Sequence, residues 1–222
     1  PNFNGFILEA KVVFDDESVE YIFTDNTWQS RCENAYKSPR VVDFTQKCDE
    51  WSLSEEIQSI WNVLPSEIKN LQREIVSEKT YKIKKHSKEE FHLELDKIHS
   101  AYVLLDINAD GEYRIEFVSS EKYRVSQKKH YIKGCSKSLY HSHEMDAVGE
   151  YRMIVDNCGD GDLTVNAKIL FVCYPSEEKG YFDCSDKDLN KIFDVSRWTV
   201  KICRQSIELD SPVHQENLHC VG

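Results

Sequence analysis

Hydrophobic and polar residues alternate along several short stretches of the chain, and this two-residue period predicts β-strands. The first two stretches, residues 6–14 and 19–23, flank the polar sequence Asp15–Ser18, which predicts a hairpin. Trp28 follows this hairpin and is expected to close one end of a β-domain, with stacking on a sugar as the alternative. Further strands are predicted at 91–95, 101–107, 113–118, 151–155 and 163–173.

Two glycine-containing turns interrupt the strands in the second half of the chain. Asp110-Gly111 precedes the strand predicted at 113–118, and Asn157–Gly161 precedes the strand predicted at 163–173. An Asp-Gly pair suits a tight turn because it adopts positive φ angles at low cost. Each turn is therefore predicted to form a hairpin with the strand before it. The expected fold is mainly β, with antiparallel, jelly-roll-like sandwich domains.

The part of the chain between the two β-regions is expected to be a connector over residues 41–90. Within it, Ser54–Ile57 predicts the capped start of a short helix that Pro65 ends. Residues 76–90 hold many Lys, Glu and Ser side chains and few large apolar ones. This composition predicts a solvent-exposed connection.

After the linker Pro175–Gly180 the hydrophobic period changes from two to that of a helix. Ser185 and Asp188 have the spacing of a capping box, and the helix is predicted to run from Asp186 to near Leu209, before Pro212. About 23 residues at 1.5 Å each give a helix of roughly 34 Å. Its predicted apolar positions are Leu189, Ile192, Phe193, Thr199, Val200, Cys203 and Ile207, and Trp198 is expected to serve packing. One long amphipathic helix after a β-region needs a packing partner, so we expect an incomplete domain.

Composition narrows the classes of partner. The chain has 222 residues and a net charge of −11, from 28 basic and 39 acidic residues. A protein that binds nucleic-acid phosphates needs a basic face, so nucleic acid is not an expected partner. The sequence has no run of apolar residues long enough to predict a membrane-spanning helix.

Eight cysteines are scattered along the chain without a C-x-x-C pair. An even number is compatible with disulfides, but the size of the chain and the spacing favour free thiols. Two polar clusters are considered as metal sites. His141 and His143 lack a second ligand pair, and the acids around Asn157 lack the glutamate spacing of a calcium loop. No metal site is therefore predicted.

The residues with the clearest chemical character are in the last thirteen positions. Asp210 and Glu216 are carboxylates on either side of Pro212, and His214 lies between them. Cleavage of a glycosidic bond needs one carboxylic acid to protonate the leaving oxygen and a second carboxylate to activate water or attack carbon. Ordinary surface acids are the alternative. A thiol nucleophile formed by Cys220 and His214 is disfavoured, since closeness in sequence says little about geometry.

The end of the chain resembles bacterial α-L-rhamnosidases. In that family, G-x-F-x-C-S-D-x-x-L enters the first helix of an (α/α)6 barrel, and D-x-P-x-(R or H)-(D or Q)-E follows in the sugar pocket. The positions of this chain that carry the resemblance are Tyr174-Pro175, Gly180-Tyr181-Phe182, Cys184-Ser185-Asp186, Leu189-Asn190, Ile192, Ser196, Thr199, Asp210-Ser211-Pro212 and His214-Gln215-Glu216. The resemblance is strong after residue 174 and weaker before residue 90.

The resemblance implies a role for each matched residue. Glu216 corresponds to the general acid of an inverting hydrolase and Asp210 to a residue that binds sugar hydroxyls, and His214 stands where many members have a substrate-contacting Arg. The general base would lie on a later helix, outside these 222 residues. The chain departs from the family at His219, where Gly is common, and at Cys220, where an aromatic is common. These departures concern the sugar subsite.

The sequence thus predicts the front part of an α-L-rhamnosidase that is inactive by itself. The expected domains are part of an N-terminal β-domain at 1–40, the connector, a sandwich at 91–174, and the truncated start of the barrel at 175–222. Its partners would be glycosides or polysaccharides with terminal α-L-rhamnose. No cofactor is needed; the resemblance leaves calcium open, without a site that can be assigned in this sequence. A bacterial cytoplasm is favoured over the periplasm or secretion. The alternatives are a carbohydrate-binding or inter-domain β-sandwich module, and a relative that binds but no longer cleaves.

Overall fold

The computed structural model describes residues 6–55, 69–122 and 127–205. The chain divides into two compact units. The first unit consists of residues 1–34 and 47–65, and the second of residues 35–46 and 66–222. Residues 35–46 and 66–90, which include part of the connector expected at 41–90, belong to the second unit.

The first unit contains two short antiparallel ribbons. Strand β1 (Glu9–Val13) pairs with β2 (Val19–Phe23), as the hairpin prediction requires, and β3 (Gln29–Ser30) pairs with β6 (Ser52–Leu53). Trp28 is half-buried, its indole N–H donates to the carbonyl of Phe23 at 2.8 Å, and its ring lies 6.1 Å from that of Phe6. Trp28 is therefore engaged within its own unit. The helix predicted from Ser54 falls mostly at 56–68, outside the described residues.

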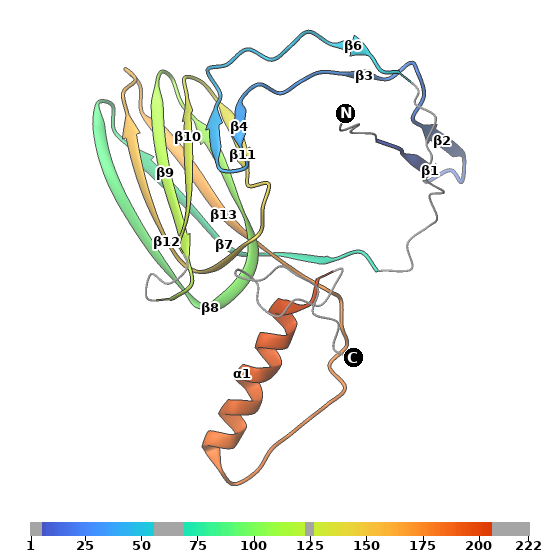
Figure 1. Ribbon diagram of the computed structural model, residues 1–222, viewed down its shortest axis with the longest axis vertical. Coiled ribbons are helices and arrows are strands. Elements are labelled where there is room, and N and C mark those ends of the chain that lie inside the picture. Colours follow the sequence, from blue (N-terminus) through green and yellow to red (C-terminus); the bar gives the residue numbers. More distant parts are fainter. Residues whose placement is uncertain (1–5, 56–68, 123–126, 206–222) are drawn as a thin grey trace. The chain divides into compact units, whose positions relative to one another are not determined.

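In the residues that the structure describes, the second unit is a β-sandwich with one helix. Its hydrogen-bonded strand order is β4-β5-β10-β9-β12-β8-β13-β7, and β11 pairs with β8. Most neighbours are antiparallel, but β5 and β10 are parallel. The strands are β4 (Tyr36–Ser38), β5 (Val41–Asp43), β7 (Gln72–Ile83), β8 (Ser87–Asn108), β9 (Tyr113–Ser120), β10 (Lys128–Gly134), β11 (Ser138–His141), β12 (Asp146–Asn157) and β13 (Leu163–Cys173), and the helix is α1 (Lys187–Cys203). Figure 1 shows β7 to β13 side by side, with α1 extending from one end of them.

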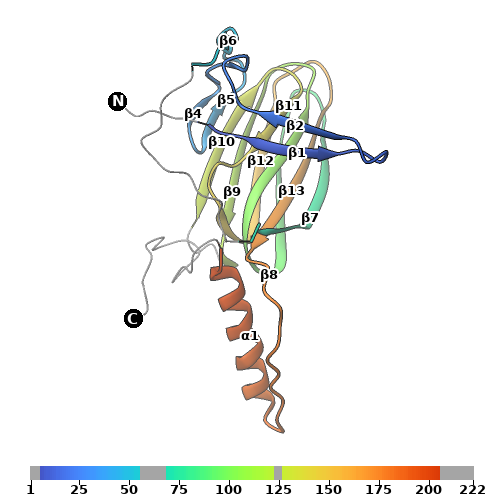
Figure 2. The ribbon, with the colours of Figure 1, turned by 90° about the vertical axis from the view of Figure 1, so that its right-hand side faces the viewer.

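Strand β8 holds the sandwich together because it changes partners along its 22 residues. Its first part, Ser87–Ala101, pairs with β12, and its last part, Ala101–Asn108, pairs with β13 on one side. Strand β11 pairs with residues 104–107 on the other side. A strand that bends in this way takes part in both layers of a sandwich. Figure 2 shows the strong curvature of this strand from a second direction.

The core lies between the two layers and is built from alternate residues of the long strands. Every second residue of β13 from Leu163 to Ile169 is buried, and the same alternation runs through β12 from Tyr151 to Asn157. Opposite faces of a strand point in opposite directions, so this pattern places one face inward and the other toward solvent. The largest side chains that are fully buried include Tyr113, Phe117, Tyr140, Tyr151, Ile107, Leu163 and Ile169.

The two predicted hairpins after β8 and β12 are wrong as hairpins, although both turns exist. Strand β9 pairs with β10 and β12, and β13 pairs with β7 and β8. Each turn therefore carries the chain from one layer to the other. The two turns pack against each other, since a Cβ on Gly111 would lie 2.7 Å from Cα of Gly159. The sequence pattern predicts that a turn is present, but it does not predict which strand pairs with the strand after the turn.

The exposed connection predicted at 76–90 is also wrong. These residues form most of β7 and the start of β8. Strand β7 is at the edge of the sheet and pairs only with β13 in the strand order. Its Lys and Glu side chains are exposed, while Tyr81 and Val76 pack against the core. An edge strand with charged side chains resists pairing with other chains, which explains its loop-like composition.

The helix begins where the sequence predicts but ends earlier. It spans Lys187–Cys203, with Arg204 already extended at φ −98°, so the predicted end near Leu209 is wrong. The N-cap is Asp186, whose carboxylate accepts hydrogen bonds from the backbone N–H groups of Asp188 and Leu189, and the predicted capping box of Ser185 is wrong. Most of the apolar positions of the helix are exposed, and only Ile202 and Cys203 are buried.

Two other sequence expectations concern the described residues. Six cysteines are free thiols, as predicted: Cys32, Cys48, Cys135, Cys158, Cys173 and Cys184. Within the described parts of the chain, α1 is too short and too polar to cross a membrane.

Candidate functional site

The three predicted site residues, Asp210, His214 and Glu216, lie outside the described residues. The same holds for His219 and Cys220. What the structure describes is the support that leads to them: α1, the linker before it, and the contacts that hold the end of α1 on the sandwich. These contacts fix the position of Gln205, which precedes Asp210 by five residues.

The start of α1 is closed by a compact polar loop. Asn190 accepts a hydrogen bond from the backbone N–H of Cys184 at 2.9 Å, and its amide nitrogen donates to the carboxylate of Asp183 and to the carbonyl of Cys184. Asp186 caps the first turn. A carboxylate at this position also interacts favourably with the helix dipole. This network explains why C-S-D-x-x-L-N is a good local signal for a helix start.

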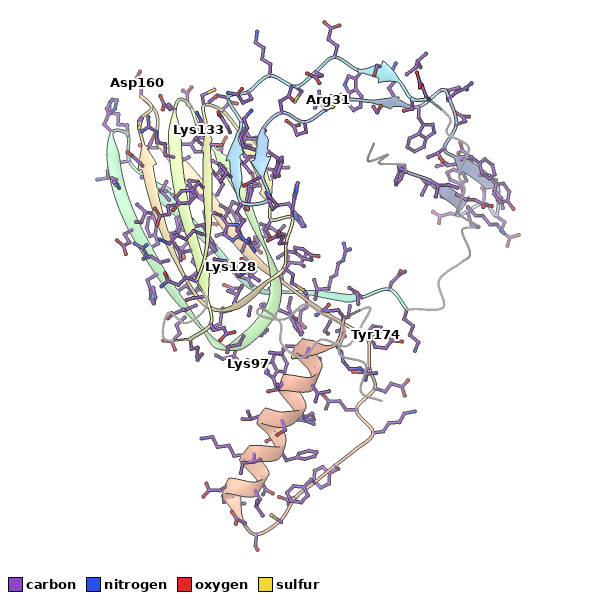
Figure 3. The ribbon with its side chains drawn as sticks, in the orientation of Figure 1. Arg31, Lys97, Lys128, Lys133, Asp160 and Tyr174 are labelled. Atoms are coloured by element: carbon purple, nitrogen blue, oxygen red, sulfur yellow. The ribbon has the colours of Figure 1, made fainter. Side chains whose placement is uncertain are left out.

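The end of α1 is tied to the strand that precedes the linker. The backbone N–H of Tyr174 donates to the carbonyl of Arg204 at 2.8 Å, and the guanidinium of Arg204 lies 5.4 Å from the centre of the Tyr174 ring. The chain therefore leaves the sandwich after Tyr174, and the end of α1 returns to lie beside Tyr174. Figure 3 shows Tyr174 next to the end of the helix.

Trp198 packs the helix against the bend of β8. Its indole N–H donates to the carbonyl of Ile98 at 2.7 Å, and its ring lies 5.5 Å from that of Phe171 in β13. The ammonium of Lys97 lies 3.6 Å from the centre of the Trp198 ring. Figure 3 shows Lys97 at this junction. The sequence-based expectation that Trp198 serves packing is confirmed.

His99 is buried beneath this contact, with its ring edge-on to both Phe171 and Trp198 at about 5 Å. Burial lowers the pKa of His99, because the apolar surroundings disfavour the charged imidazolium. Its Nδ1 atom has no hydrogen-bond partner among the described residues. His99 therefore acts as a neutral, mostly apolar packing group at the junction.

Gln205, the last described residue, also holds the end of α1 on the sandwich. Its amide nitrogen lies 3.1 Å from the hydroxyl oxygen of Ser100 and 3.0 Å from the carbonyl oxygen of Val172. The Ser100 hydroxyl donates to the same carbonyl at 2.9 Å. Both side chains are buried, so these bonds are protected from water. These hydrogen bonds join β8, β13 and the end of α1.

A groove of about 640 Å³ runs between α1 and the bend of β8. Charged groups of both signs line it, including Asp96, Lys97, Lys122, Asp194 and Arg197, and Arg197 pairs with Glu178 at 2.8 Å. Among the residues that the structure describes, no cluster of His, Cys, Asp and Glu has the geometry to hold a metal ion. The groove therefore offers polar contacts from both acidic and basic side chains.

A second polar cleft of about 310 Å³ lies on the outer face of β8, β9 and β12. Arg152 contacts Glu90 at 3.7 Å and Glu116 at 3.2 Å, and His92 lies 3.7 Å from Glu150. The sequence analysis did not single out these residues. Their only signal is the polar half of the strand alternation, which any solvent-facing sheet shares.

A fully buried polar network around His130 and Asp146 also escaped sequence analysis. The imidazole of His130 contacts Asp146 at 2.8 Å and the hydroxyl of Tyr140 at 2.7 Å, and Ser119 donates to Asp146 at 2.6 Å. Arg40 lies beside the same carboxylate. Burial alone would raise the pKa of Asp146, but the hydrogen bonds and positive charge around it hold the pKa below its usual value. Because His130 and Asp146 are inaccessible to solvent, the network serves structure.

The two polar clusters that the sequence analysis weighed as metal sites are used differently. His141 contacts the carbonyl of Ser142 at 2.7 Å, and His143 stacks on Tyr36 with ring centres 4.2 Å apart. In the turn after β12, the amide nitrogen of Asn157 donates to the carbonyl of Gly161 at 2.9 Å. Asp160 is fully exposed and lies 3.2 Å from His86.

Comparison with known proteins gives limited information. No protein family model matches the chain, and no curated protein matches it. Among solved structures, the GH78 family rhamnosidase of Bacillus sp. GL1 is similar over 57% of this chain and 14% of its own, with 20% identity and a TM-score of 0.48. A rhamnosidase from Klebsiella oxytoca with rhamnose bound is similar over 62% of this chain and 31% of its own, with 12% identity and a TM-score of 0.49.

A third solved structure, PirA, is similar over 41% of this chain and 92% of its own, with 12% identity and a TM-score of 0.30. The chain thus has rhamnosidases among its structural neighbours, at low identity and over part of its length. It spans less than a third of either rhamnosidase. Likenesses at this level do not identify an activity.

Proposed function

We propose that this chain is part of an α-L-rhamnosidase, with Glu216 as the general acid and with Asp210 and His214 as residues that bind the sugar. The proposal starts from the sequence motif that runs from Gly180 to Glu216, where residue types and spacing resemble those of the family. Its substrates would be glycosides or polysaccharides with terminal α-linked L-rhamnose. The chemistry needs no cofactor.

The observation that carries the proposal is the anchoring of α1 up to Gln205. A general acid works only when it is held within hydrogen-bond reach of the leaving oxygen. The contacts of Trp198, Arg204 and Gln205 hold the end of α1 on the sandwich as far as Gln205. Rigid β-structure that supports a short functional segment is the usual arrangement in proteins that act on a bound ligand.

In the proposed reaction, the protonated carboxyl of Glu216 gives its proton to the glycosidic oxygen as the bond to the anomeric carbon breaks. A carboxylate supplied from outside residues 1–222 takes a proton from water, and the oxygen of that water bonds to the anomeric carbon from the opposite face. Inversion requires about 6.5–9.5 Å between the two carboxyl groups. Glu216 must stay protonated near neutral pH, so we expect a raised pKa in the complete, partly dry pocket. Without the base, residues 1–222 alone should not turn over substrate.

The test is hydrolysis of an aryl α-L-rhamnoside by the full protein that contains this chain. Replacement of the acid in Glu216→Gln should lower kcat by roughly 10²–10⁴-fold. Glu177→Gln is the matched control, because Glu177 is an exposed carboxylate on the linker that pairs with the exposed side chain of Lys179. It should leave kcat unchanged.

Two results would count against the proposal. Turnover that survives Glu216→Gln would keep the enzyme class but remove Glu216 as the acid. Absence of turnover on any aryl α-L-rhamnoside would reject the enzyme class.

A further inference from the structure

The polar cleft on the outer face of β8, β9 and β12 is a recess with polar groups at its floor. In the register of β9 and β12, Ser120 lies opposite Glu150. Both alternate with residues that pack into the core, so both point to the outer face of the sheet. They are nonetheless buried, since Ser120 is 4% and Glu150 is 9% exposed. The cleft is therefore sunk into the sheet, unlike an open charged surface.

The groups that line the cleft are held in fixed orientations. Ser120 donates to one carboxylate oxygen of Glu150 at 2.9 Å, and the other oxygen lies 3.7 Å from Nε2 of His92. The guanidinium of Arg152 lies 3.7 Å from Glu90 and 3.2 Å from Glu116. Side chains that are already oriented lose less conformational entropy when a ligand binds.

The charges around the cleft restrict the kind of ligand. The three carboxylates of Glu90, Glu116 and Glu150 outnumber Arg152 and His92, whichever form His92 takes. An anionic ligand would be repelled by this excess of negative charge. Within the ranges that the structure describes, no group of acids and histidines is arranged to hold a metal ion.

The hydrogen-bonding groups of the cleft suit a ligand with several hydroxyls. A carboxylate only accepts hydrogen bonds and a guanidinium only donates them, so a matching ligand must offer donors and acceptors side by side. Adjacent hydroxyl groups of a sugar do both. The volume of about 310 Å³ is at the lower end of the range for small-molecule sites, which corresponds to a short piece of a saccharide.

An exposed aromatic ring stands beside these groups. Tyr131 of β10 lies opposite Glu116 in the register of β9 and β10, and its side chain is 45% exposed. It alternates with the buried residues His130 and Ile132, so it points to the same outer face as Glu116. A ring with an apolar face and a polar hydroxyl suits the C–H face of a sugar.

We infer that the cleft around Arg152 is a second saccharide-binding site, which holds a part of a polysaccharide other than the rhamnose that is cleaved. The choice of a rhamnose-bearing polysaccharide as the ligand rests on the proposed function. Arg152 donates to sugar hydroxyls, Glu150 and Glu90 accept from them, and Tyr131 packs against the sugar ring.

The experiment is isothermal titration of the full protein with a thio-linked oligosaccharide that ends in α-L-rhamnose, because a sulfur linkage resists hydrolysis. We expect the wild-type protein to bind it at the active site and at the cleft. Arg152→Met removes the donors and keeps the apolar stem, so affinity at the cleft should fall by about 10–100-fold. Both kcat and KM for a small aryl α-L-rhamnoside, which reports on the active site, should change by less than about twofold.

A matched control and a second variant accompany Arg152→Met. Arg114→Met is the same change on the same face of β9, at an exposed arginine that pairs with Glu112, and should alter neither affinity nor kinetics. Glu90→Gln, at a side chain that is mostly exposed, replaces Arg152→Met if that variant does not fold. It should weaken binding at the cleft by about 2–10-fold. Circular dichroism and thermal unfolding report whether each variant is folded.

A titration of the wild-type protein with spermidine tests whether the acids bind a cation instead. Saccharide binding that weakens in Arg152→Met, with unchanged hydrolysis of the aryl substrate, supports the inference. Saccharide binding that neither folded variant weakens, or binding of spermidine without saccharide at the cleft, overturns it and leaves the rhamnosidase in place. Saccharide binding that depends on Arg152, in a protein that hydrolyses no α-L-rhamnoside, overturns the proposed function and keeps the saccharide site.

Discussion

The indole nitrogen of Trp198, in α1, lies 2.7 Å from the carbonyl oxygen of Ile98, in β8. The two residues are one hundred positions apart in sequence, and their contact joins the helix to the bend of the strand that links both layers of the sandwich. The Trp198 ring also packs against Phe171 and His99. Trp198 is thus the largest side chain that α1 places on the sandwich.

Truncation of this side chain should release the helix. Trp198→Ala removes a half-buried indole and is expected to destabilise the docked helix by about 3 kcal/mol. Trp198→Phe keeps most of the packing and should cost about 1 kcal/mol for the lost hydrogen bond. Hydrogen exchange of the α1 amides measures both changes. Val200→Ala, at a position 59% exposed, is the control and should stay within about 0.5 kcal/mol of wild type.

Tyr81 and Tyr151 form a hydrogen bond across the core, so the effects of replacing them on the free energy of unfolding should be coupled. Their hydroxyl oxygens lie 2.8 Å apart and join β7 to β12, which are separated by β8 and β13 in the strand order. Tyr151→Phe should lower the free energy of unfolding by about 1 kcal/mol, because it leaves the partner hydroxyl unsatisfied. The double variant with Tyr81→Phe should cost less than the sum of the single changes. Strictly additive losses in urea titrations would contradict the coupling.

The buried carboxylate of Asp146 should make stability fall in acid. Its pKa is depressed in the folded protein, so its stabilising contribution is fully present above the unfolded value of about 4 and is lost as the pH falls through the folded value. Asp146→Asn should lower the free energy of unfolding at neutral pH by about 2 kcal/mol and flatten its dependence on pH below about 4.

Urea titrations at several pH values measure this dependence. Asp160→Asn, at a fully exposed carboxylate, should leave both the stability and the slope nearly unchanged. An unchanged slope in Asp146→Asn would show that other groups control the acid response.

The contact between the two layer-crossing turns should tolerate no side chain at Gly111. This residue has φ of +118°, and an added Cβ would lie 2.7 Å from Cα of Gly159. Gly111→Ala is expected to cost about 2 kcal/mol from backbone strain and steric overlap. Gly180→Ala, where no atom lies within 4 Å of the added carbon, should be neutral within about 0.5 kcal/mol. Thermal unfolding compares the two variants, and equal melting temperatures would contradict the argument.

The sequence by itself determined the local features of this protein. An apolar run located the strand around Ala101–Ile107, and a mostly apolar stretch after the turn at Asn157–Gly161 located the strand at Leu163–Cys173. Asp110-Gly111 marked a turn, and the change of period after Gly180 located the helix. These features depend on neighbouring residues, whose spacing decides which face of an element is apolar. The candidate residues Asp210, His214 and Glu216 also came from sequence alone, through their types and the resemblance that they carry.

Only the tertiary structure decided which strands pair and which polar groups meet. Strand β8 serves two layers, the turn at Gly111 crosses between them, and the charged edge strand β7 looks like a loop in composition. The contacts of Ser100 with Gln205 and of His130 with Asp146 have no local pattern, because each partner lies on a different element. A polar residue that is buried by distant parts of the chain is indistinguishable in sequence from one in solvent. Its role follows from the fold that encloses it.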